Sequence, residues 1–327
     1  MNQFDDILVS LLLPVYNVEP YIEKCCRSLF EQTYDNLEYV FIDDCCTDNS
    51  IRVLQSVLTE YPLRQKQVKI IRHERNRGQA SGRNTAIRNA SGEYIVFVDA
   101  DDWIEKNAIE LLVNKQKTTD ADIVYGQMRA HYENYEEDLV EPDYENKSEM
   151  IKHATELTID HSLCKRLYRK MLFKDNEIAC VDGWDYGEDH YLLPQLYWYA
   201  KKIERIDDVI YHYNCWKAGK VNPELVTIWK MWSNELCIID ALISFFIDKD
   251  EACVESLKKT KVDCLYSCMV QSISHRTRRK YNELAASLYA MPKNLLMACF
   301  KNTIQRLFYR YYDTRLLYRA IVKVFFQ

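Results

Sequence analysis

A cluster of carboxylates behind an apolar run is the part of this sequence best suited to chemistry. Asp99, Asp101 and Asp102, with Ala100 between the first two, directly follow the run YIVFV. Carboxylates one residue apart on a turn that leaves a strand can hold a hard divalent cation against phosphate oxygens, while water completes the coordination. The alternative, which suits Asp102 better than Asp101, is that these aspartates cap a helix that begins at Glu105.

Polar side chains also follow two other apolar runs that read as buried strands. Tyr16 and Asn17 come after the first run of the chain, and Asp43 and Asp44 close the second. The carboxyl ends of parallel strands meet at one edge of a sheet, and ligands bind beyond that edge. We therefore expect these side chains and the aspartates after YIVFV to gather at one site.

The elements that must position these residues alternate between strand and helix. Short apolar runs without helical spacing predict strands, and apolar residues three or four positions apart predict helices. Such alternation predicts an α/β fold in which crossover helices connect the strands of a parallel sheet. The expected strands are residues 7–14, 37–42, 67–71, 94–98 and 122–125, and the expected helices are residues 18–32, 48–59, 79–89, 105–115 and 190–199.

The length of the chain allows one large α/β domain with an appendage, or two domains. It has 327 residues, and 48% of them are hydrophobic. From residue 225 the pattern becomes helical, and no Pro- or Gly-rich linker precedes the change. We therefore predict a catalytic α/β domain over residues 1–220 and a helical C-terminal region over residues 221–327.

Charge and cysteine usage restrict the setting of the protein. The net charge of -6 combines about +9 in residues 251–327 with about -15 in the first 250 residues, so the tail is the part expected to meet an anionic surface. The 12 cysteines lack disulfide-framework or zinc-finger spacing, which fits a reducing compartment. The sequence shows no signal peptide and no apolar run of about 18 residues, so we expect a soluble or peripheral protein.

Four segments in order resemble the family 2 glycosyltransferases of the GT-A fold. They are VSLLLPVYN, FIDDCCTDNS, NRGQASGRNTAI and GEYIVFVDADDW, and the resemblance resumes at CKRLY, YGED and IDDVIYHYN. One departure is that Cys45 and Cys46 stand where the family's acidic segment usually has Gly-Ser, which removes a flexible position. The resemblance implies a Rossmann-like, mostly parallel sheet flanked by helices, a UDP-sugar as donor substrate, and Mn²⁺ or Mg²⁺ as cofactor.

The resemblance also implies roles for individual residues in donor binding. Asp44 matches the carboxylate that accepts a hydrogen bond from the uracil N3–H, and Tyr16 offers a ring to stack on the base. Asp101 matches the metal ligand, and Asp99 is its neighbour toward the ribose and a second candidate ligand. The implied donor-binding residues are Pro14, Val15, Tyr16, Asp44, Arg83, Asn84, Asp99 and Ala100, with Arg83 and Asn84 on the diphosphate side.

Glu188 and Asp189 match the Glu-Asp pair from which, in this family, one carboxylate serves as general base. Direct displacement at the anomeric carbon requires the acceptor hydroxyl to lose its proton as it attacks. We favour Asp189 for this role, with Glu188 second. The alternative is that the pair supplies only negative charge at the N-terminus of the helix over residues 190–199.

Residues expected on the acceptor side each have a structural alternative. Trp184 could serve as a platform for a sugar, but buried packing is the commoner role of tryptophan. Lys165 could contact acceptor or phosphate, or it could be a solvated surface lysine. We expect Trp198 in the core. His212 could join the metal, although ordinary packing in a strand is favoured.

Two further segments are defined by their charge. Residues 303–327 place basic side chains mostly four positions apart among apolar ones, which suits a helix on an anionic membrane or a docked amphipathic helix. The sequence leaves both alternatives open. Residues 131–147 are acidic and rich in tyrosine, and we predict an exposed variable loop there.

The resemblance implies an inverting transfer of a sugar from a UDP-sugar to a hydroxyl of a glycan or lipid-linked glycan. By resemblance we expect a role in surface polysaccharide synthesis, in the cytoplasm or at the inner face of the membrane, without a nucleic-acid partner. One alternative is a catalytically inactive subunit of the same fold. Another is a nucleotidyltransferase, but PVYNVEPY supplies no Gly-rich phosphate loop. The sugar, the linkage and the oligomeric state stay open.

Overall fold

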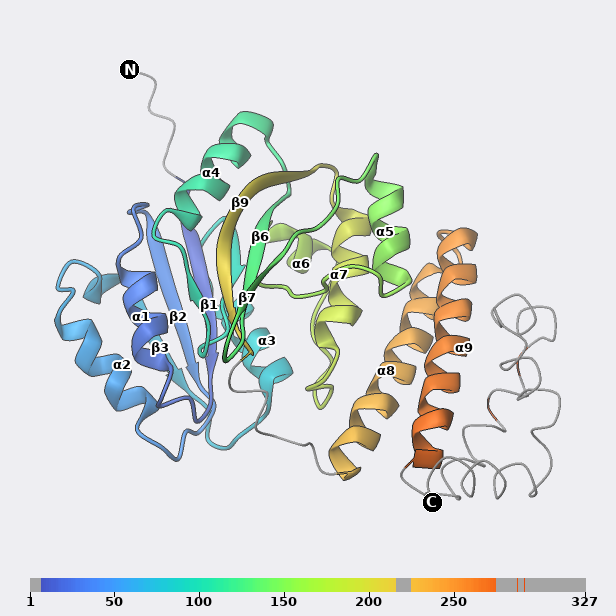
Figure 1. The fold of residues 1–327 in the computed structure, drawn as a ribbon. Helices are drawn as coiled ribbons and strands as arrows, with labels where there is room; N and C mark the ends of the chain where they lie inside the picture. The colour runs from blue at the N-terminus through green and yellow to red at the C-terminus, as the bar shows by residue number, and fades with distance from the viewer. Residues whose placement is uncertain (1–6, 216–224, 275–286, 288–290, 292–327) are drawn as a thin grey trace. The chain divides into compact units, whose positions relative to one another are not determined.

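The computed structural model describes residues 7–215 and 225–274, together with Ser287 and Met291 (Figure 1). The strands are β1 (Val9–Val15), β2 (Leu37–Asp43), β3 (Val68–Arg72), β4 (Tyr94–Phe97), β5 (Trp103–Ile104), β6 (Ile123–His131), β7 (Glu136–Leu139), β8 (Arg166–Arg169) and β9 (Ile203–Asn214). The helices are α1 (Ile22–Phe30), α2 (Ser50–Thr59), α3 (Gln79–Asn89), α4 (Ala108–Thr119), α5 (Lys147–Thr155), α6 (Met171–Asp175), α7 (Glu188–Tyr199), α8 (Leu225–Phe246) and α9 (Glu251–Ser274), and a short 3₁₀ helix, η1, spans Gln65–Gln67.

The chain divides into two compact units. The first comprises Met1–Ile151 with Ile159–Asn222, and the second comprises Lys152–Thr158 with Pro223–Gln327. A boundary near residue 220 between two domains that each fold on their own stays a prediction.

One sheet organises the first unit, and its strands lie in the order β3-β2-β1-β4-β8-β6-β9-β5, with β7 paired to β6. The α/β fold class predicted from the sequence is confirmed. From β3 to β4 all neighbouring strands are parallel, as the alternation of strands and helices predicts. Beyond β4 the sheet is mixed, because β8 runs antiparallel to both β4 and β6.

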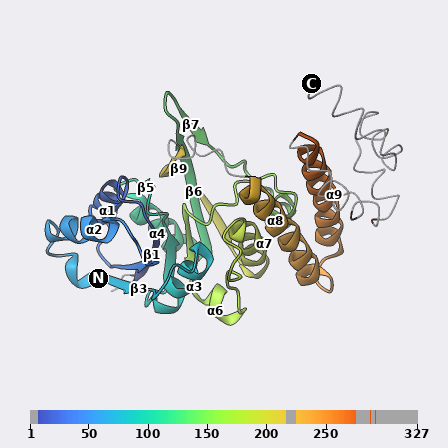
Figure 2. The same cartoon turned by 90° about the horizontal axis from the view of Figure 1, so that it is seen from below.

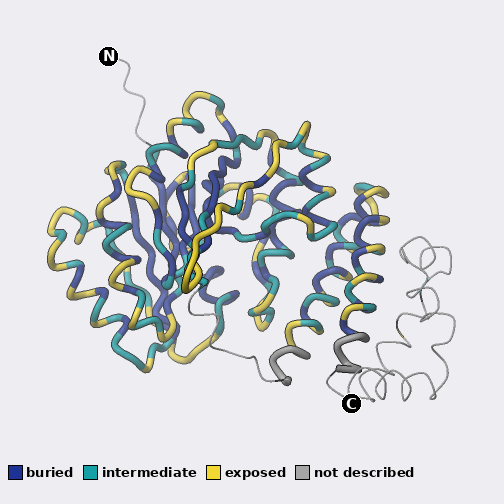
Figure 3. The backbone as a smooth tube through the Cα atoms, in the orientation of Figure 1, coloured by how far each residue is buried: buried dark blue, intermediate teal, exposed yellow. Residues whose placement is uncertain are grey.

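The parallel strands are apolar because both faces of the sheet are covered. Every residue of β2 is buried, and so are six of the seven residues of β1. Figure 3 shows these strands as the most buried part of the unit. The register pairs Val15 with Asp43, and the amide of Asp44 donates to the carbonyl of Val15 at 3.0 Å. The acidic residues after β2 therefore lie level with the end of β1.

The crossover helices are divided between the two faces of the sheet. The connections from β1 to β2 and from β2 to β3 move outward, and the connection to β4 returns past β1. Right-handed crossovers then place α3 on the face opposite α1 and α2, as Figure 2 shows. Small residues let α3 approach the sheet closely: a β-carbon at Gly82 would lie 3.0 Å from Cβ of Pro14.

The prediction of a loop over residues 131–147 is wrong in part. Strand β6 continues to His131 and forms a hairpin with β7, whose four residues pair antiparallel with Met128 to His131. The residues of this hairpin from Tyr132 to Asp138 are exposed, as predicted. The sequence pattern did not identify this acidic and aromatic segment as a strand, because β7 lies at the surface and buries no apolar face.

Helices α8 and α9 make up most of the described part of the second unit. Ile238, Leu242 and Phe246 of α8 are buried, as are Leu257 and Leu265 of α9. Among the described residues, no helix combines the length and hydropathy needed to cross a membrane. The predicted basic helix over residues 303–327 lies outside the described residues.

Candidate functional site

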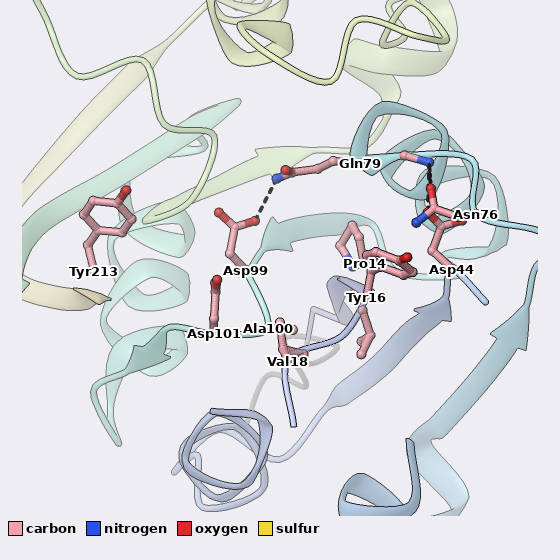
Figure 4. Close-up of a pocket in the computed structure, with 12 residues that line it drawn as sticks. Pro14, Tyr16, Val18, Asp44, Asn76, Gln79, Asp99, Ala100, Asp101 and Tyr213 are labelled. Carbon is pink, nitrogen blue, oxygen red and sulfur yellow. Dashed lines mark hydrogen bonds between the residues drawn. The ribbon is translucent and has the colours of Figure 1, made fainter. Parts of the chain in front are cut away.

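A cavity of about 400 Å³ opens where the carboxyl ends of β1, β2 and β4 meet. It lies where the sequence predicts a site, because parallel strands bring their last residues to one edge. Figure 4 shows Asp99 and Asp101 between Tyr213 on one side and Tyr16 and Asp44 on the other. The lining residues are Pro14, Val15, Tyr16, Val18, Asp44, Asn76, Gly78, Gln79, Asp99, Ala100, Asp101 and Tyr213.

Asp44 is buried at the end of the cavity and is fixed by three donors. Its Oδ1 lies 2.7 Å from Nδ1 of His73 and accepts from the amide of Arg77 at 2.9 Å. Its Oδ2 accepts from the amide of Gly78 at 2.9 Å. An ionised carboxylate can only accept, so the proton of a neutral His73 ring lies on Nδ1, and Nε2 accepts from the hydroxyl of Thr85 at 3.0 Å. This chain of contacts fixes the orientation of the carboxylate.

Gly78 is the position at which the loop before α7 comes closest to this end of the cavity. Its φ is 84°, in the left-handed region, and a β-carbon there would lie 2.1 Å from Oδ1 of Asp185. Two further contacts tie the same loop to α3 and to the residues just before it: Asp182 accepts from the hydroxyl of Ser81 at 2.7 Å and pairs with Arg77 at 3.3 Å. The backbone conformation therefore favours glycine at position 78, and a β-carbon there would require the side chain of Asp185 to move.

The three aspartates that follow β4 differ in their surroundings. Asp99 and Asp101 line the cavity. Asp102 is buried, and its two oxygens accept from the hydroxyl of Tyr211 at 2.8 Å and from the amide of Asn214 at 2.9 Å. The alternative that Asp102 caps a helix is therefore wrong, because it fastens β9 to the turn that carries the other two carboxylates.

The buried guanidinium of Arg83 joins three carboxylates from two parts of the chain. Its Nη2 donates to Oδ1 of Asp99 at 3.3 Å, and its Nη1 donates to Oε1 of Glu188 at 3.0 Å and to Oδ1 of Asp189. Oδ1 of Asp99 also accepts from the side chain of Gln79 at 3.2 Å. The Glu-Asp pair at the start of α7 is thereby connected to the carboxylate after β4, although neither member of the pair lines the cavity.

Burial controls the protonation of the pair on α7. It raises the pKa of Glu188 to about 7, because loss of water outweighs the attraction of Arg83. Burial also raises the pKa of Asp189 above its ordinary value, again against the attraction of Arg83. The side chain of Asp189 is 22% exposed and that of Glu188 is 7% exposed, so Asp189 is the more accessible of the two. The pair therefore interacts specifically with Arg83, in addition to any interaction with the helix dipole.

Asn84 and Lys165 lie away from the cavity. The side-chain amide of Asn84 donates to the carbonyl of Cys180 at 2.8 Å, and its oxygen accepts from the amide of Cys180 at 2.9 Å. Lys165 is completely buried and pairs with Glu141 at 2.8 Å and with Asp160 at 2.9 Å. Lys165 is therefore not the solvated surface lysine that the sequence left as an alternative, and its partners are internal.

The predicted aromatic residues and His212 pack as follows. Trp184 is half-buried and meets the ring of Tyr191 edge to face at 5.5 Å. Trp198 is half-buried instead of lying fully in the core. His212 stacks on Trp103 at 5.2 Å, and its Nε2 lies 2.8 Å from Glu105. These contacts agree with the packing alternative for His212.

Sequence reasoning missed His73, Gln79 and Tyr213. His73 precedes residues 76–78 of the NRG segment, and Gln79 directly follows them. Their position next to this segment could have indicated contact with the carboxylates. Tyr213 lines the cavity, whereas His212 faces away from it. The two-residue period of a strand puts Tyr211 and Tyr213 on one face, which was the available signal.

Comparison with protein families gives one family match. The model described as glycosyl transferase family 2 matches residues 10–177, which is half of the chain. Glycosyltransferase GlyA of Streptococcus pneumoniae is 31% identical over 250 residues, which are 72% of this chain and 34% of that protein. The uncharacterized glycosyltransferase EpsJ of Bacillus subtilis is 29% identical over 231 residues, which are 67% of this chain and 63% of that protein. The chain thus spans only part of the length of these relatives.

A solved structure of similar fold is that of TarS residues 1–349 from Staphylococcus aureus. Its TM-score is 0.68 at 20% sequence identity, and the alignment covers 96% of this chain and 87% of that one. At this identity the likeness concerns the fold, and it supports the GT-A architecture.

Proposed function

Because the chain belongs to glycosyl transferase family 2, we propose that it transfers a sugar from a UDP-sugar to a hydroxyl of a glycan acceptor with inversion at the anomeric carbon. The observation that carries the proposal is the convergence of carboxylates from separate strand ends. Asp44 follows β2, Asp99 and Asp101 follow β4, and all three line one cavity. In the same fold, structures of TarS were solved with UDP and with UDP-GlcNAc.

The contacts of Asp44 favour uracil over cytosine as the base. An ionised carboxylate has about four acceptor positions, and the described residues fill two at Oδ1 and one at Oδ2. The remaining position on Oδ2 suits the N3–H of uracil. Cytosine presents an acceptor at N3, so that atom could not donate to the carboxylate. Tyr16, which is 45% exposed, stands beside this position with a ring free to stack.

Asp99 and Asp101 fit a divalent cation that is shared with the donor. Among the described residues, no group of three or more His, Cys, Asp or Glu side chains forms a metal site of its own. Mn²⁺ and Mg²⁺ in such sites take one or two carboxylates and complete their shell with phosphate oxygens and water. When bound, the cation would neutralise the departing diphosphate. A more distant neighbour, a mannosyltransferase from Pyrobaculum calidifontis, was solved with GDP-Man and Mn²⁺.

Asp189 is the proposed general base, and Arg83 connects it to Asp99. The carboxylate of Asp189 is oriented by Arg83 and by the amide of Leu163, which donates to Oδ2 at 3.3 Å. It is more accessible than Glu188, and burial raises its pKa, which makes it a stronger base than an ordinary aspartate. Glu188 is the second candidate.

The acceptor is proposed to be a hydroxyl of a cell-surface polysaccharide or its lipid-linked precursor. This is supported by relatives named poly(ribitol-phosphate) β-glucosyltransferase and poly(ribitol-phosphate) β-N-acetylglucosaminyltransferase TarS. We place the reaction at the cytoplasmic side of the membrane. The basic residues 303–327 are proposed as the contact with anionic lipid, and deletion of this segment should abolish binding to anionic vesicles while UDP-sugar hydrolysis persists.

The test is a donor screen that measures nucleotide release with Mn²⁺ for wild type, Asp101→Ala and Asp189→Ala. We expect metal-stimulated turnover of one UDP-sugar, with a loss of about a hundredfold or more in each variant. UDP binding without turnover of any UDP-sugar would instead identify an inactive binding subunit. Turnover that is indifferent to both substitutions would contradict the proposed site.

A further inference from the structure

The hairpin of β6 and β7 ends in a pair of exposed, stacked tyrosines. The rings of Tyr132 and Tyr135 lie 4.4 Å apart at an angle of 16°, and the amide of Tyr132 donates to the carbonyl of Tyr135 at 2.9 Å. Tyr132 is 36% exposed and Tyr135 is 59% exposed. Figure 3 colours the tip of the hairpin as exposed (yellow). The pair thus presents aromatic surface to solvent at a fixed position.

Strand pairing connects this tip directly to the cavity. Strand β6 pairs with β9, and Ala130 lies opposite Tyr213, a lining residue. His131 lies opposite Asn214, whose side-chain amide donates to the carbonyl of Asp101 at 3.3 Å. Tyr132, the first residue of the tyrosine pair, therefore directly follows His131. The strand partner of His131 is Asn214, which contacts the turn that carries Asp101.

The tip lies beyond the sugar end of the cavity. In Figure 4, Asp44 and Tyr16 stand on one side of Asp99 and Asp101, and Tyr213 stands on the other. If Asp44 receives the base and the two aspartates receive the diphosphate, as proposed above, the transferred sugar points toward Tyr213. The hairpin behind Tyr213 is then on the side from which an acceptor must approach.

Charge on the hairpin selects the kind of acceptor. Arg129 and His131 are already paired within it, to Asp138 at 2.5 Å and to Glu136 at 2.9 Å. Glu133 and Glu137 are exposed, so the hairpin carries net negative charge. Carboxylates accept hydrogen bonds from sugar hydroxyls, but they repel a chain of phosphates.

We propose that Tyr132 and Tyr135 form a binding platform for a neutral pyranose of the acceptor. The C–H face of the sugar packs on the exposed face of Tyr135, and hydroxyls at its rim donate to the carboxylates of Glu133 and Glu137. This inference rests on the proposed function for the identity of the adjoining cavity. It adds a site and a substrate class, a neutral pyranose in place of a polyanionic backbone.

The competing role for the pair is structural. Aromatic residues that stack across a hairpin stabilise it by cross-strand packing, whatever binds there. A purely structural pair would, when removed, loosen β6 and β9 together and weaken the cavity that Tyr213 lines. A platform would, when removed, weaken sugar binding while UDP binding persists. The two roles therefore separate in a pair of measurements.

The experiment is saturation-transfer NMR on the full chain with methyl β-D-glucopyranoside, methyl β-D-galactopyranoside and ribitol 5-phosphate, beside a UDP titration in Mn²⁺. In Tyr135→Ala we expect the transfer to a pyranoside that binds the wild type to fall about two- to tenfold. Tyr135→Phe should retain it. Leu63→Ala, at a side chain that is 90% exposed elsewhere in the unit, is the control and should change nothing. UDP affinity should be equal in all four proteins.

Several outcomes would overturn the platform. They are equal transfer in wild type and Tyr135→Ala, no transfer to either pyranoside in wild type, stronger transfer to ribitol 5-phosphate, or UDP affinity lost together with sugar binding. A wild type that ignores UDP but contacts a pyranoside through Tyr135 would instead refute the proposed function and leave a sugar-binding surface. The two failures are therefore distinguishable.

Discussion

Arg83 and Glu188 form an ion pair of 3.0 Å in which the two side chains are only 1% and 7% exposed. The same guanidinium reaches Asp189 and Asp99. One buried cation therefore serves three carboxylates, and the pair on α7 cannot ionise fully at low cost. This arrangement makes the charge of the proposed base depend on its neighbour.

The first prediction concerns the pH dependence of turnover. Because burial raises the pKa of Asp189, the proposed base, kcat/KM should rise with pH over a range that lies above the ordinary pKa of an aspartate. In Glu188→Gln, Asp189 shares Arg83 only with Asp99, so the acid limb should move to lower pH. Asp182→Asn, at an exposed carboxylate outside the pair, is the control. A variant Glu188→Gln that is inactive at every pH, beside an active Asp189→Asn, would make Glu188 the base.

The second prediction concerns stability at the same residue. The pKa of Glu188 is about 7 in the folded protein and near its ordinary 4.5 when unfolded, so the folded state binds this proton more tightly. This proton contributes about 3 kcal/mol to the free energy of unfolding. The contribution is fully present below pH 4.5 and is lost as the pH rises through 7. Urea unfolding of wild type and Glu188→Gln across this range should show that difference in slope. Parallel curves for the two proteins would contradict it.

A third prediction separates Asp101 from Asp102. Asp101→Asn should abolish the effect of Mn²⁺ on UDP-sugar binding. Asp102→Asn should destabilise the protein by about 1–3 kcal/mol, because it disturbs hydrogen bonds from Tyr211 and Asn214. Calorimetric titration and denaturant unfolding measure the two effects. The reverse pattern would mean that the two roles have been exchanged.

The fourth prediction concerns base selection by Asp44. Asp44→Asn retains the shape but replaces an acceptor-only group with an amide, so UDP should bind about tenfold more weakly or worse. The affinity for CDP should fall less than the affinity for UDP. The ratio of UDP affinity to CDP affinity should therefore decrease. Asp43→Asn is the matched control, because Asp43 accepts from the amide of Cys46 and lies outside the cavity lining. Equal losses for UDP and CDP in Asp44→Asn would argue against contact with the base.

The fifth prediction uses two glycines with nearly equal φ. Gly78 has φ 84° with Asp185 in the way of a β-carbon, and Gly183 has φ 86° with no atom within 4 Å. Gly183→Ala should cost about 1 kcal/mol through backbone strain alone. Gly78→Ala should cost more, and it should also weaken UDP binding, because the amide of Gly78 donates to Asp44. Equal stability of the two variants would show that Asp185 moves aside freely.

Much of the first unit could be predicted from the sequence because its signals are local. Apolar runs and helical spacing predict β1 to β4, α1 to α4 and the start of β6, and α3 has the predicted bounds, but the two-residue strand β5 was missed. The antiparallel return of β8 could not be predicted, because strand direction depends on long-range pairing. Strand β7 was missed because an exposed edge strand lacks the alternation of buried and exposed residues that identifies a strand.

By itself the sequence determined which residue types stand at the ends of strands, and therefore that Asp44, Asp99 and Asp101 meet at one edge. The alternation of strands and helices along the chain predicts parallel strands, and parallel strands end at the same edge of a sheet. Only the tertiary structure decided how side chains far apart in the chain share partners. It buried Lys165, turned Asn84 toward Cys180, and gave Arg83 three carboxylates. The reason is physical: burial and hydrogen bonding are set by the packing of distant segments, and no local pattern records them.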